Sequence, residues 1–309
     1  MPENTQLAVV TGASSGIGYA TVRVLAARGF HVLAGVRSET DAQRLTGKNV
    51  EGVILDITDP AHVAAIAHRV ENDAARRPLA ALVNNAGVAL NAPIEILPIE
   101  EWRRHFEVNF FGHVAVTQAL LPALVAGRGR VVNISSIGGR VAFPTYGAYA
   151  ASKFALEAVS DVLRREVGRY GVYVIVIEPG TVNSAMWGKG LTNIQEVAAG
   201  FAAGASDAQK ARYSDLLAAM TKQAEANVRN GNGVDPARVA TVIADAIQAR
   251  RPRTRYLAGR DAKLLARLAA LLPDRAFDRV VARSLGLRQP SAPAAASQAP
   301  GKVAGPATA

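Results

Sequence analysis

The chain contains no cysteine, and this absence removes several kinds of chemistry from consideration. Disulfide bonds, thiolate nucleophiles and cysteine-ligated zinc sites are all excluded, which fits a reducing compartment. Histidine is scarce too, and its five occurrences show none of the close spacings that bind a metal. We therefore expect no metal site, and structural or solvent-exposed roles for His31, His62, His68, His105 and His113.

Long hydrophobic runs are also lacking. Half of the 309 residues are apolar, which is enough for a sizeable core, yet we find no apolar run of ~20 residues that could span a bilayer. The first apolar stretch, residues 7–10, leads directly into a glycine-rich turn, unlike a signal peptide. The sequence predicts a cytoplasmic protein without a transmembrane segment.

Acidic residues are outnumbered, so the formal net charge is +10. Between residues 250 and 288, eleven lysines and arginines face three aspartates. Such a patch attracts nucleic acid, an anionic membrane or an anionic cofactor. Because these charges alternate with helical apolar residues and carry no nucleic-acid motif, we favour a solvated helix face and expect no nucleic-acid partner.

Short β-branched segments alternate with longer helical patterns through the first 180 residues. The segments are largely apolar, as expected of parallel strands covered on both faces. Repeated strand–helix–strand units predict a doubly wound, Rossmann-like parallel sheet in a single α/β domain over residues 1–260. The expected strands are residues 7–11, 31–36, 52–55, 80–84, 130–135 and 172–177, and helices are expected to begin near Gly16, Pro60, Pro98 and Tyr146.

In the last third of the chain, strand-like and helix-like segments no longer alternate regularly. Residues 181–232 are rich in Gly, Ala and Asn, and we expect them to form a mobile helical lid over an apolar substrate. The alternative is an ordinary helical insertion that faces the domain's own core. The larger apolar residues of this segment are Met186, Trp187, Leu191, Ile194, Phe201, Leu216, Leu217 and Met220.

Beyond the lid, Asp235-Pro236 is a good start for a further helix, and residues 254–257 can form a last strand. Residues 261–288 are predicted to be a C-terminal amphipathic helical extension, broken at Pro273. Residues 289–309 contain hardly any large apolar side chain, so we expect a disordered tail.

A glycine-rich turn follows the first expected strand. Gly12 permits the turn, Gly16 lets the backbone approach a pyrophosphate, and Gly18 allows the next helix to pack closely on the strand. The helix N-terminus offers free N–H groups and the positive end of its dipole to phosphates. We therefore predict a dinucleotide site formed by Gly12, Ser14, Ser15, Gly16, Ile17 and Gly18.

The end of the second strand selects the cofactor. An acidic residue there would bind the ribose hydroxyls of NAD, but this chain has Val36 and then Arg37. An arginine pairs well with the 2′-phosphate of NADP. We predict that NADP(H) is preferred, with NAD(H) as the alternative.

Tyr149 and Lys153 form the second strong signal. Their spacing of four puts phenol and ammonium on one helix face, where a cation lowers the pKa of a phenol and makes it a usable acid/base. Ser136 ends a strand thirteen positions upstream and can hydrogen-bond a substrate oxygen. A serine hydrolase is excluded, because residues 133–138 are not the G-x-S-x-G elbow and no histidine lies in a triad position.

Together these motifs resemble the short-chain dehydrogenase/reductase family over roughly residues 5–260. Residues 11–18 match the TGxxxGxG pattern and residues 84–87 the NNAG element, and residues 157–166 and 176–180 resemble the retinol and steroid dehydrogenase branch. The resemblance implies the catalytic residues Asn109, Ser136, Tyr149 and Lys153. Besides the glycine turn and Arg37, it implies cofactor contacts from Asp56, Ile57, Asn85, Ala86, Gly87, Tyr149, Lys153, Pro179, Gly180, Val182 and Ser184.

The resemblance also implies the mechanism. Tyr149 would exchange a proton with the substrate oxygen while a hydride passes between nicotinamide and carbon, and Ser136 would orient that oxygen. Lys153 would lower the pKa of Tyr149 and hold the nicotinamide ribose, and Asn109 would support a water that links Lys153 to solvent. We expect a lipophilic alcohol or ketone as substrate, and a homodimer or homotetramer.

Three alternatives stay open. The same catalytic residues serve a 3-oxoacyl thioester reductase. A non-catalytic dinucleotide-sensing regulator keeps the glycine turn but usually loses the tyrosine. A nucleotide-sugar epimerase or dehydratase shares Tyr and Lys, but its TGxxGxxG pattern calls for glycine where this chain has Ser15.

Overall fold

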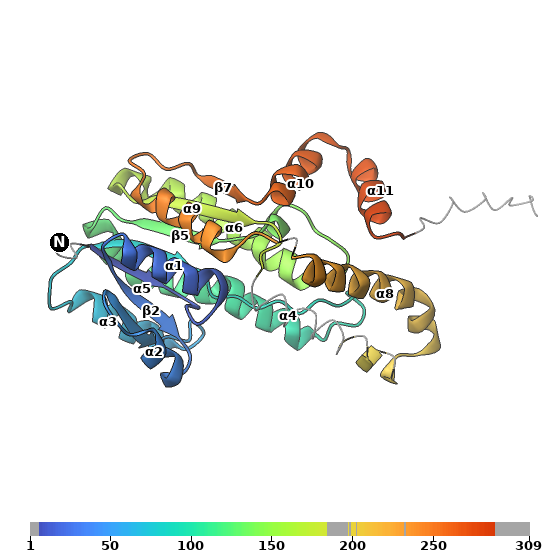
Figure 1. The fold of residues 1–309 in the computed structure, drawn as a ribbon, viewed down its shortest axis with the longest axis horizontal. Helices are drawn as coiled ribbons and strands as arrows, with labels where there is room; N and C mark the ends of the chain where they lie inside the picture. The colour runs from blue at the N-terminus through green and yellow to red at the C-terminus, as the bar shows by residue number, and fades with distance from the viewer. Residues whose placement is uncertain (1–5, 184–196, 198, 202, 232, 288–309) are drawn as a thin grey trace, which may run out of the picture.

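A computed structural model describes residues 6–183, 197, 199–201, 203–231 and 233–287 (Figure 1). Within them, one seven-stranded parallel sheet has the order β3-β2-β1-β4-β5-β6-β7. The strands are β1 (Gln6–Val10), β2 (Phe30–Val36), β3 (Val50–Ile54), β4 (Leu79–Asn84), β5 (Arg130–Ile134), β6 (Tyr173–Pro179) and β7 (Arg255–Ala258). The predicted doubly wound fold is confirmed.

Helices cover both faces of the sheet, so consecutive strand side chains enter two different cores. On one face, Ala8 and Val10 of β1 pack against helices α1 (Gly16–Ala27), α2 (Glu39–Leu45) and α9 (Pro236–Gln248). On the other, Leu7 and Val9 pack against α3 (Pro60–Glu71), α5 (Gly112–Ala126) and α6 (Gly147–Val167). This double burial explains why the strands are apolar along their whole length.

Helix starts follow the predicted capping signals. The Asp59 and Asp235 side chains each accept a hydrogen bond from a first-turn N–H, at 2.8 Å, and a proline occupies the first helical position. The sequence analysis missed α2, which has only seven residues and begins after Ser38, whose hydroxyl accepts from Asp41 N at 3.2 Å.

One continuous helical segment, Ile99–Ala126, corrects an expectation. It joins α4 (Ile99–Phe106), a π-helical turn (Glu107–Phe111) and α5, and by length and composition it is apolar enough to cross a membrane. The sequence analysis had found no such run. In this fold, Val116, Leu120 and Leu124 of the segment are buried against the sheet and belong to the core.

The expected lid is more regular than its composition indicated. Residues 207–230 form one helix, α8 (Asp207–Asn230), which begins with a reciprocal capping box between Ser206 and Gln209. Among its apolar residues Leu217 and Met220 are buried, as is Phe201, which favours the alternative of an insertion that faces the fold itself. Met186, Trp187, Leu191 and Ile194 lie outside the described residues.

The C-terminal extension consists of α10 (Arg260–Leu271) and α11 (Asp274–Ser284), and the break at Pro273 is confirmed. In Figure 1 both helices lie at the outer edge of the molecule, beyond the edge strand β7. The expected tail at 289–309 lies outside the described residues.

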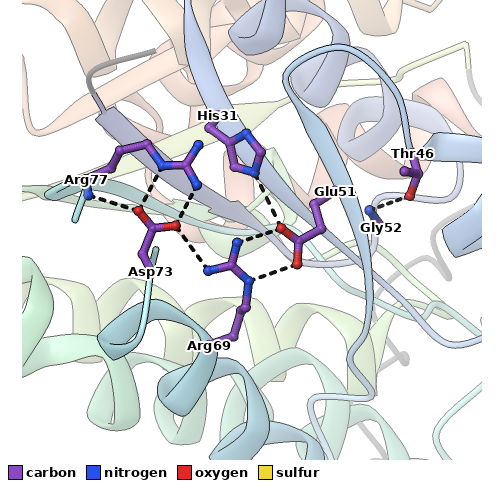
Figure 2. Close-up of polar contacts among 7 residues, drawn as sticks. All are labelled: His31, Thr46, Glu51, Gly52, Arg69, Asp73 and Arg77. Atoms are coloured by element: carbon purple, nitrogen blue, oxygen red, sulfur yellow. Dashed lines mark hydrogen bonds and ion pairs between the residues drawn. The ribbon is translucent and has the colours of Figure 1, made fainter. Parts of the chain in front are cut away.

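An ion-pair network ties the amino ends of the strands to α3 (Figure 2). Asp73, 5% exposed, accepts hydrogen bonds from Arg77 Nε at 2.9 Å and from Arg69 Nη1 at 3.1 Å. Arg69 also holds both oxygens of Glu51, at 2.9 and 2.6 Å, and His31 Nε2 lies 3.5 Å from Glu51 Oε2. The hydrogen bonds from Arg77 keep the pKa of Asp73 well below its ordinary 3.8, although burial opposes them.

This network should stabilise the fold in a pH-dependent way. Asp73→Asn should lower the free energy of unfolding at neutral pH by about 3 kcal/mol, because two arginines lose their buried carboxylate. A depressed folded pKa stabilises only above the unfolded value, so wild type and variant should converge as pH falls below 3.8. Denaturant titrations at several pH values measure the difference.

The exposed pair of Asp245 with Arg28 provides the control, since Asp245→Asn should lower the free energy of unfolding by at most about 1 kcal/mol. A pH-independent difference for Asp73→Asn would contradict the argument.

Candidate active site

The glycine turn between β1 and α1 has the conformation and the space that a dinucleotide phosphate needs. Gly12 and Gly16 have φ of +64° and +57°, in the left-handed region that favours glycine. A Cβ at Gly12 would lie 2.7 Å from Ala86 Cα, and one at Gly18 would collide with the Gly12 carbonyl oxygen. Any larger side chain would therefore fill the cradle or push the helix away.

The N-terminus of α1 is available to an anion. Its N-cap residue, Ser15, makes no side-chain capping bond, and no acidic residue lies in the first turn. The first N–H groups and the positive end of the helix dipole are thus free for a phosphate. Together with the glycine cradle, this donor set fits a dinucleotide pyrophosphate, and Ser14 and Ile17 belong to the same turn.

A hydrogen-bonded clamp joins this turn to the loop after β4. Thr11 Oγ1 accepts from the N–H groups of Asn85 and Ala86, at 2.9 and 3.0 Å. In return, Asn85 Nδ2 donates to the carbonyl oxygens of Thr11 and Gly12, at 2.9 and 3.1 Å. Two predicted cofactor loops, far apart in the sequence, are therefore held as one unit.

Two arginines lie on the adenosine side of the turn. Arg37 directly follows β2 and is exposed, as the sequence predicted. Arg44 of α2 was missed: its Nη2 donates to the Ser14 carbonyl at 2.9 Å, and its guanidinium lies 5.9 Å from the Tyr19 ring centroid. Asp41 pairs with Arg44 at 2.6 Å, so part of that charge is neutralised, whereas Arg37 stays the freer cation for a 2′-phosphate.

Asp56 and Ile57 lie after β3, beside Arg37. Burial raises the pKa of Asp56, but hydrogen bonds from the Thr58 N–H and hydroxyl, with the charge of Arg37, bring it below its ordinary value. The Asp56 carboxylate is therefore ionised and available to an adenine amino group. Ile57 is buried against Gly112 instead, so only its backbone is left for a cofactor.

Asn109 and Lys153 meet at Gly87. A Cβ at Gly87 would lie 3.4 Å from Asn109 Oδ1 and 4.0 Å from Lys153 Nζ. The π-helical turn places Asn109 so that its amide accepts from Val88 N at 2.9 Å and donates to Val88 O at 3.0 Å. A sequence pattern does not reveal such a turn, since it inserts one extra residue into the helical repeat.

Ser136 and Tyr149 face each other across Gly138. A Cβ at Gly138 would lie 3.1 Å from Tyr149 Cε1 and 3.3 Å from Ser136 Oγ. The Ser136 hydroxyl accepts from Gly138 N at 3.0 Å, which fixes its orientation. The structure thus brings the four predicted catalytic side chains together at the carboxyl ends of β4 and β5.

Burial dominates the electrostatics of Lys153 and Tyr149. Lys153 is only 4% exposed, donates from Nζ to the Ile134 carbonyl at 2.9 Å, and lies 5.9 Å from the Tyr149 ring centroid. Burial lowers the pKa of Lys153 to about 8, with Glu157 opposing the shift. Burial also raises the pKa of Tyr149, against a hydrogen bond with Ser136. Burial therefore dominates both shifts in this arrangement, and the expectation that Lys153 lowers the pKa of Tyr149 stays a prediction.

The comparisons with known proteins agree with this geometry. The model of the family described as short chain dehydrogenase matches residues 6–194. The chain belongs to the short-chain dehydrogenase/reductase family. The resemblance stated from the sequence is thus confirmed.

Several family members resemble the chain over most of its length. An NADPH-dependent 3-dehydrocapnine reductase of Ornithobacterium rhinotracheale is 35% identical, covering 90% of this chain and 96% of its own. Human retinol dehydrogenase 5 is 38% identical (91% and 89%), and human 17-beta-hydroxysteroid dehydrogenase type 6 is 35% identical (89% and 87%). A solved short-chain dehydrogenase of Streptomyces avermitilis superposes with a TM-score of 0.70 at 29% identity (92% and 96%). The chain lies in the retinol and steroid branch of the family.

Asp261, at the start of α10, is a further residue at the short-chain dehydrogenase site that the sequence analysis missed. Its Oδ2 accepts from Thr181 N at 2.7 Å, and its carboxylate fills the space beside Gly180. The predicted turn at Pro179 and Gly180 is held between β7 and this carboxylate, and Val182 forms a bridge with Val234. Ser184 lies outside the described residues.

The two buried histidines have structural roles beside the site. His113 Nε2 donates to the Ala86 carbonyl at 2.7 Å, and burial lowers the pKa of this imidazole to about 3, so it stays neutral. His105 Nε2 accepts from Leu90 N at 2.9 Å while its Nδ1 donates to the Glu101 carbonyl. Both shape the loop after β4, and neither faces Tyr149 as a base.

Proposed function

We propose that the protein is an NADP(H)-dependent oxidoreductase that interconverts a lipophilic alcohol and the corresponding ketone or aldehyde. The observation that carries the proposal is the convergence of Asn109, Ser136, Tyr149 and Lys153 around two glycines, next to a cradle suited to a dinucleotide. Membership of the family supports oxidoreductase chemistry, and a bound nicotinamide would supply or accept the hydride.

Tyr149 acts as the proton donor in the reductive direction. Because burial raises its pKa, the phenol is protonated at neutral pH and ready to give its proton to a carbonyl oxygen. Ser136 hydrogen-bonds the same oxygen and orients it. Each proton given up by Tyr149 must be replaced, which requires a path to solvent.

Lys153 and Asn109 supply that path. The Lys153 ammonium has three N–H donors, and one of them donates to the Ile134 carbonyl. The other two are available to Tyr149, a ribose hydroxyl or a water. Asn109 Nδ2 also donates to Ser152 Oγ at 3.1 Å, and Ser152 donates to the Tyr149 carbonyl at 2.7 Å. These bonds lock the start of α6 to the π-helical turn, so that the proton groups keep their spacing.

Apolar side chains around Tyr149 support a lipophilic substrate. The Tyr146 ring packs edge-on at 6.3 Å, and Phe143 and Leu216 lie in the same apolar cluster. Trp102 and Ile94 lie close to Gly147, since a Cβ at this glycine would be 3.1 Å from the Trp102 ring and 3.3 Å from Ile94. The names of the retinol and steroid dehydrogenases among its relatives agree with this chemistry.

The acid/base role can be tested at one atom. Tyr149→Phe should lower kcat by about 10²–10⁴-fold, the usual contribution of a positioned acid, while the Kd for NADPH stays within about threefold. Tyr146→Phe, the neighbouring phenol, should keep most activity. In wild type, the reductive rate should fall as pH rises through about 8 and above, where Lys153 and then Tyr149 lose their protons. Substantial turnover by Tyr149→Phe would refute the acid/base role of Tyr149. Wild type that binds NADPH but turns over no carbonyl substrate would favour the dinucleotide-sensing regulator.

Cofactor choice can be tested at Arg37. Arg37→Ala should raise the KM for NADPH about tenfold or more, as expected for the loss of a charge-assisted hydrogen bond, and should hardly change that for NADH. Arg165→Ala, an exposed arginine on α6, should change neither. Equal effects of Arg37→Ala on both cofactors would show that this residue does not read the 2′-phosphate. The NADPH-dependent relative supports the proposed preference.

The substrate class can be tested with a series of ketones of increasing chain length at fixed NADPH. Each methylene buried against the apolar walls should raise kcat/KM by up to about fourfold, equivalent to ~0.8 kcal/mol. Acyl thioesters in the same assay test the 3-oxoacyl thioester reductase, and a chelator should have no effect. A flat series, or a preference for small polar carbonyls, would exclude the lipophilic substrate.

A further inference from the structure

The outer face of α10 combines basic and apolar residues in one stripe. The inner face, with Ala262, Leu265 and Ala269, packs against the core. The residues opposite are exposed, and at 100° per residue they fall within an arc of about 100°. They are Arg260, Lys263, Leu264, Arg267 and Leu271. Leu264 is 58% exposed and Leu271 80%, which is far more than a helix that packs only on its own fold requires.

Helix α11 continues the basic character of this surface. Phe277, Val281 and Leu285 face inward, against Phe143 and Met220. Arg275, Arg279 and Arg283 are exposed on the opposite side, with Val280 beside them. In Figure 1 both helices lie at the edge of the molecule.

The cations of this surface have no partners of their own. Elsewhere, Arg140, Arg212 and Arg255 each pair with a carboxylate. In the described part of the chain, no ion pair or side-chain hydrogen bond involves the six cations of α10 and α11, and Asp261 is occupied by Thr181. We call the exposed residues Arg260, Lys263, Leu264, Arg267, Leu271, Arg275, Arg279, Val280 and Arg283 the basic–leucine face.

We propose that the basic–leucine face docks on the surface of an anionic lipid bilayer. A helix with cations and leucines on one face binds in the plane of the membrane interface, where leucines enter the acyl boundary and cations meet lipid phosphates. A nucleic acid would use the cations but not the leucines. A second copy seated on this face is disfavoured, because a two-fold contact would bring the six cations of one copy against those of the other.

The remaining chain does not offer a better occupant. Residues 286–309 contain no Asp or Glu, so they cannot neutralise the basic–leucine face. The inward face of α11 contacts Phe143 and Met220, so this helix lies between the docked surface and the apolar cluster beside Tyr149. Docking itself does not depend on the proposed reaction.

The test is flotation of the full-length protein with vesicles. We expect binding to an equal mixture of phosphatidylglycerol and phosphatidylcholine, and about tenfold weaker binding to phosphatidylcholine alone or at about 1 M salt, where charges are screened. Arg267→Glu with Arg279→Glu should lower the partition coefficient about tenfold or more. Leu264→Ser with Leu271→Ser should also lower it severalfold, although the charge is unchanged.

Matched controls separate docking from general attraction of a basic protein. Arg250→Glu with Arg251→Glu makes the same change of charge at the other end of β7, and Ile99→Ser removes an apolar residue that is 56% exposed on α4. Both should bind as wild type. Three results would overturn the proposal. Wild type does not bind anionic vesicles, or the control variants lose as much binding as the test variants. In the third, the leucine variants bind fully, as expected if charge alone drives the contact.

A second measurement does not depend on loss of binding. Leu271→Trp places an indole at the most exposed position of the basic–leucine face, and its emission should shift to shorter wavelength when anionic vesicles are added, relative to wild type. An unshifted emission from vesicle-bound protein would show that another surface makes the contact. Melting temperatures of all variants should match wild type, since the substituted side chains are exposed.

Discussion

The clamp between Thr11 and Asn85 is the interaction on which the rest of the site depends. It joins the turn after β1 to the loop after β4 through four hydrogen bonds, using one hydroxyl and one amide. The amide can span both carbonyl groups only because Gly18 leaves no Cβ in its way, while Gly12 leaves room for Ala86. Gly87, two residues beyond Asn85, then fixes where Asn109 and Lys153 approach the cofactor site. A single constraint thus sets the distance between phosphate cradle and proton groups.

Burial has the second large influence, and it acts on the acid and on the cation together. Lys153 and Tyr149 are both withdrawn from water, so the pKa of the amine falls while that of the phenol rises. Both changes disfavour the charged form of the group concerned, so the phenol of Tyr149 is neutral at rest. Glu157, one turn further along α6, opposes the shift of Lys153 and is itself held by Arg255 at 3.0 Å. The charge on Lys153 therefore depends on residues that do not touch the substrate.

The sequence was sufficient to predict the sheet, because its strands are buried on both faces and read as apolar segments between capped helices. The glycine turn, Tyr149 and Lys153 were also predictable, since each depends on residues close together in the chain. Asp261 and Arg44 were not, because their partners Thr181 and Ser14 lie far away in sequence and only the tertiary fold brings them together. The π-helical turn at Asn109 was missed for a different reason: its sequence is compatible with an ordinary helix. The extent of burial around Tyr149, which raises its pKa, was not predictable either, because spacing shows a neighbouring cation but not what covers the phenol.

Charge is distributed unevenly between the two ends of the strands, and this asymmetry has a physical reason. At the amino ends, Asp73 and Glu51 are each held by arginine, so the edge opposite the site is rigid. At the carboxyl ends, where glycines leave space for a ligand, hydrogen bonds such as that of Lys153 to Ile134 hold the side chains of the site. Beyond them, the cations of α10 and α11 are exposed and unpaired within the described chain, so they keep their full attraction for an external anion. A carboxylate added among them would stabilise the helices only slightly, but it would weaken that attraction.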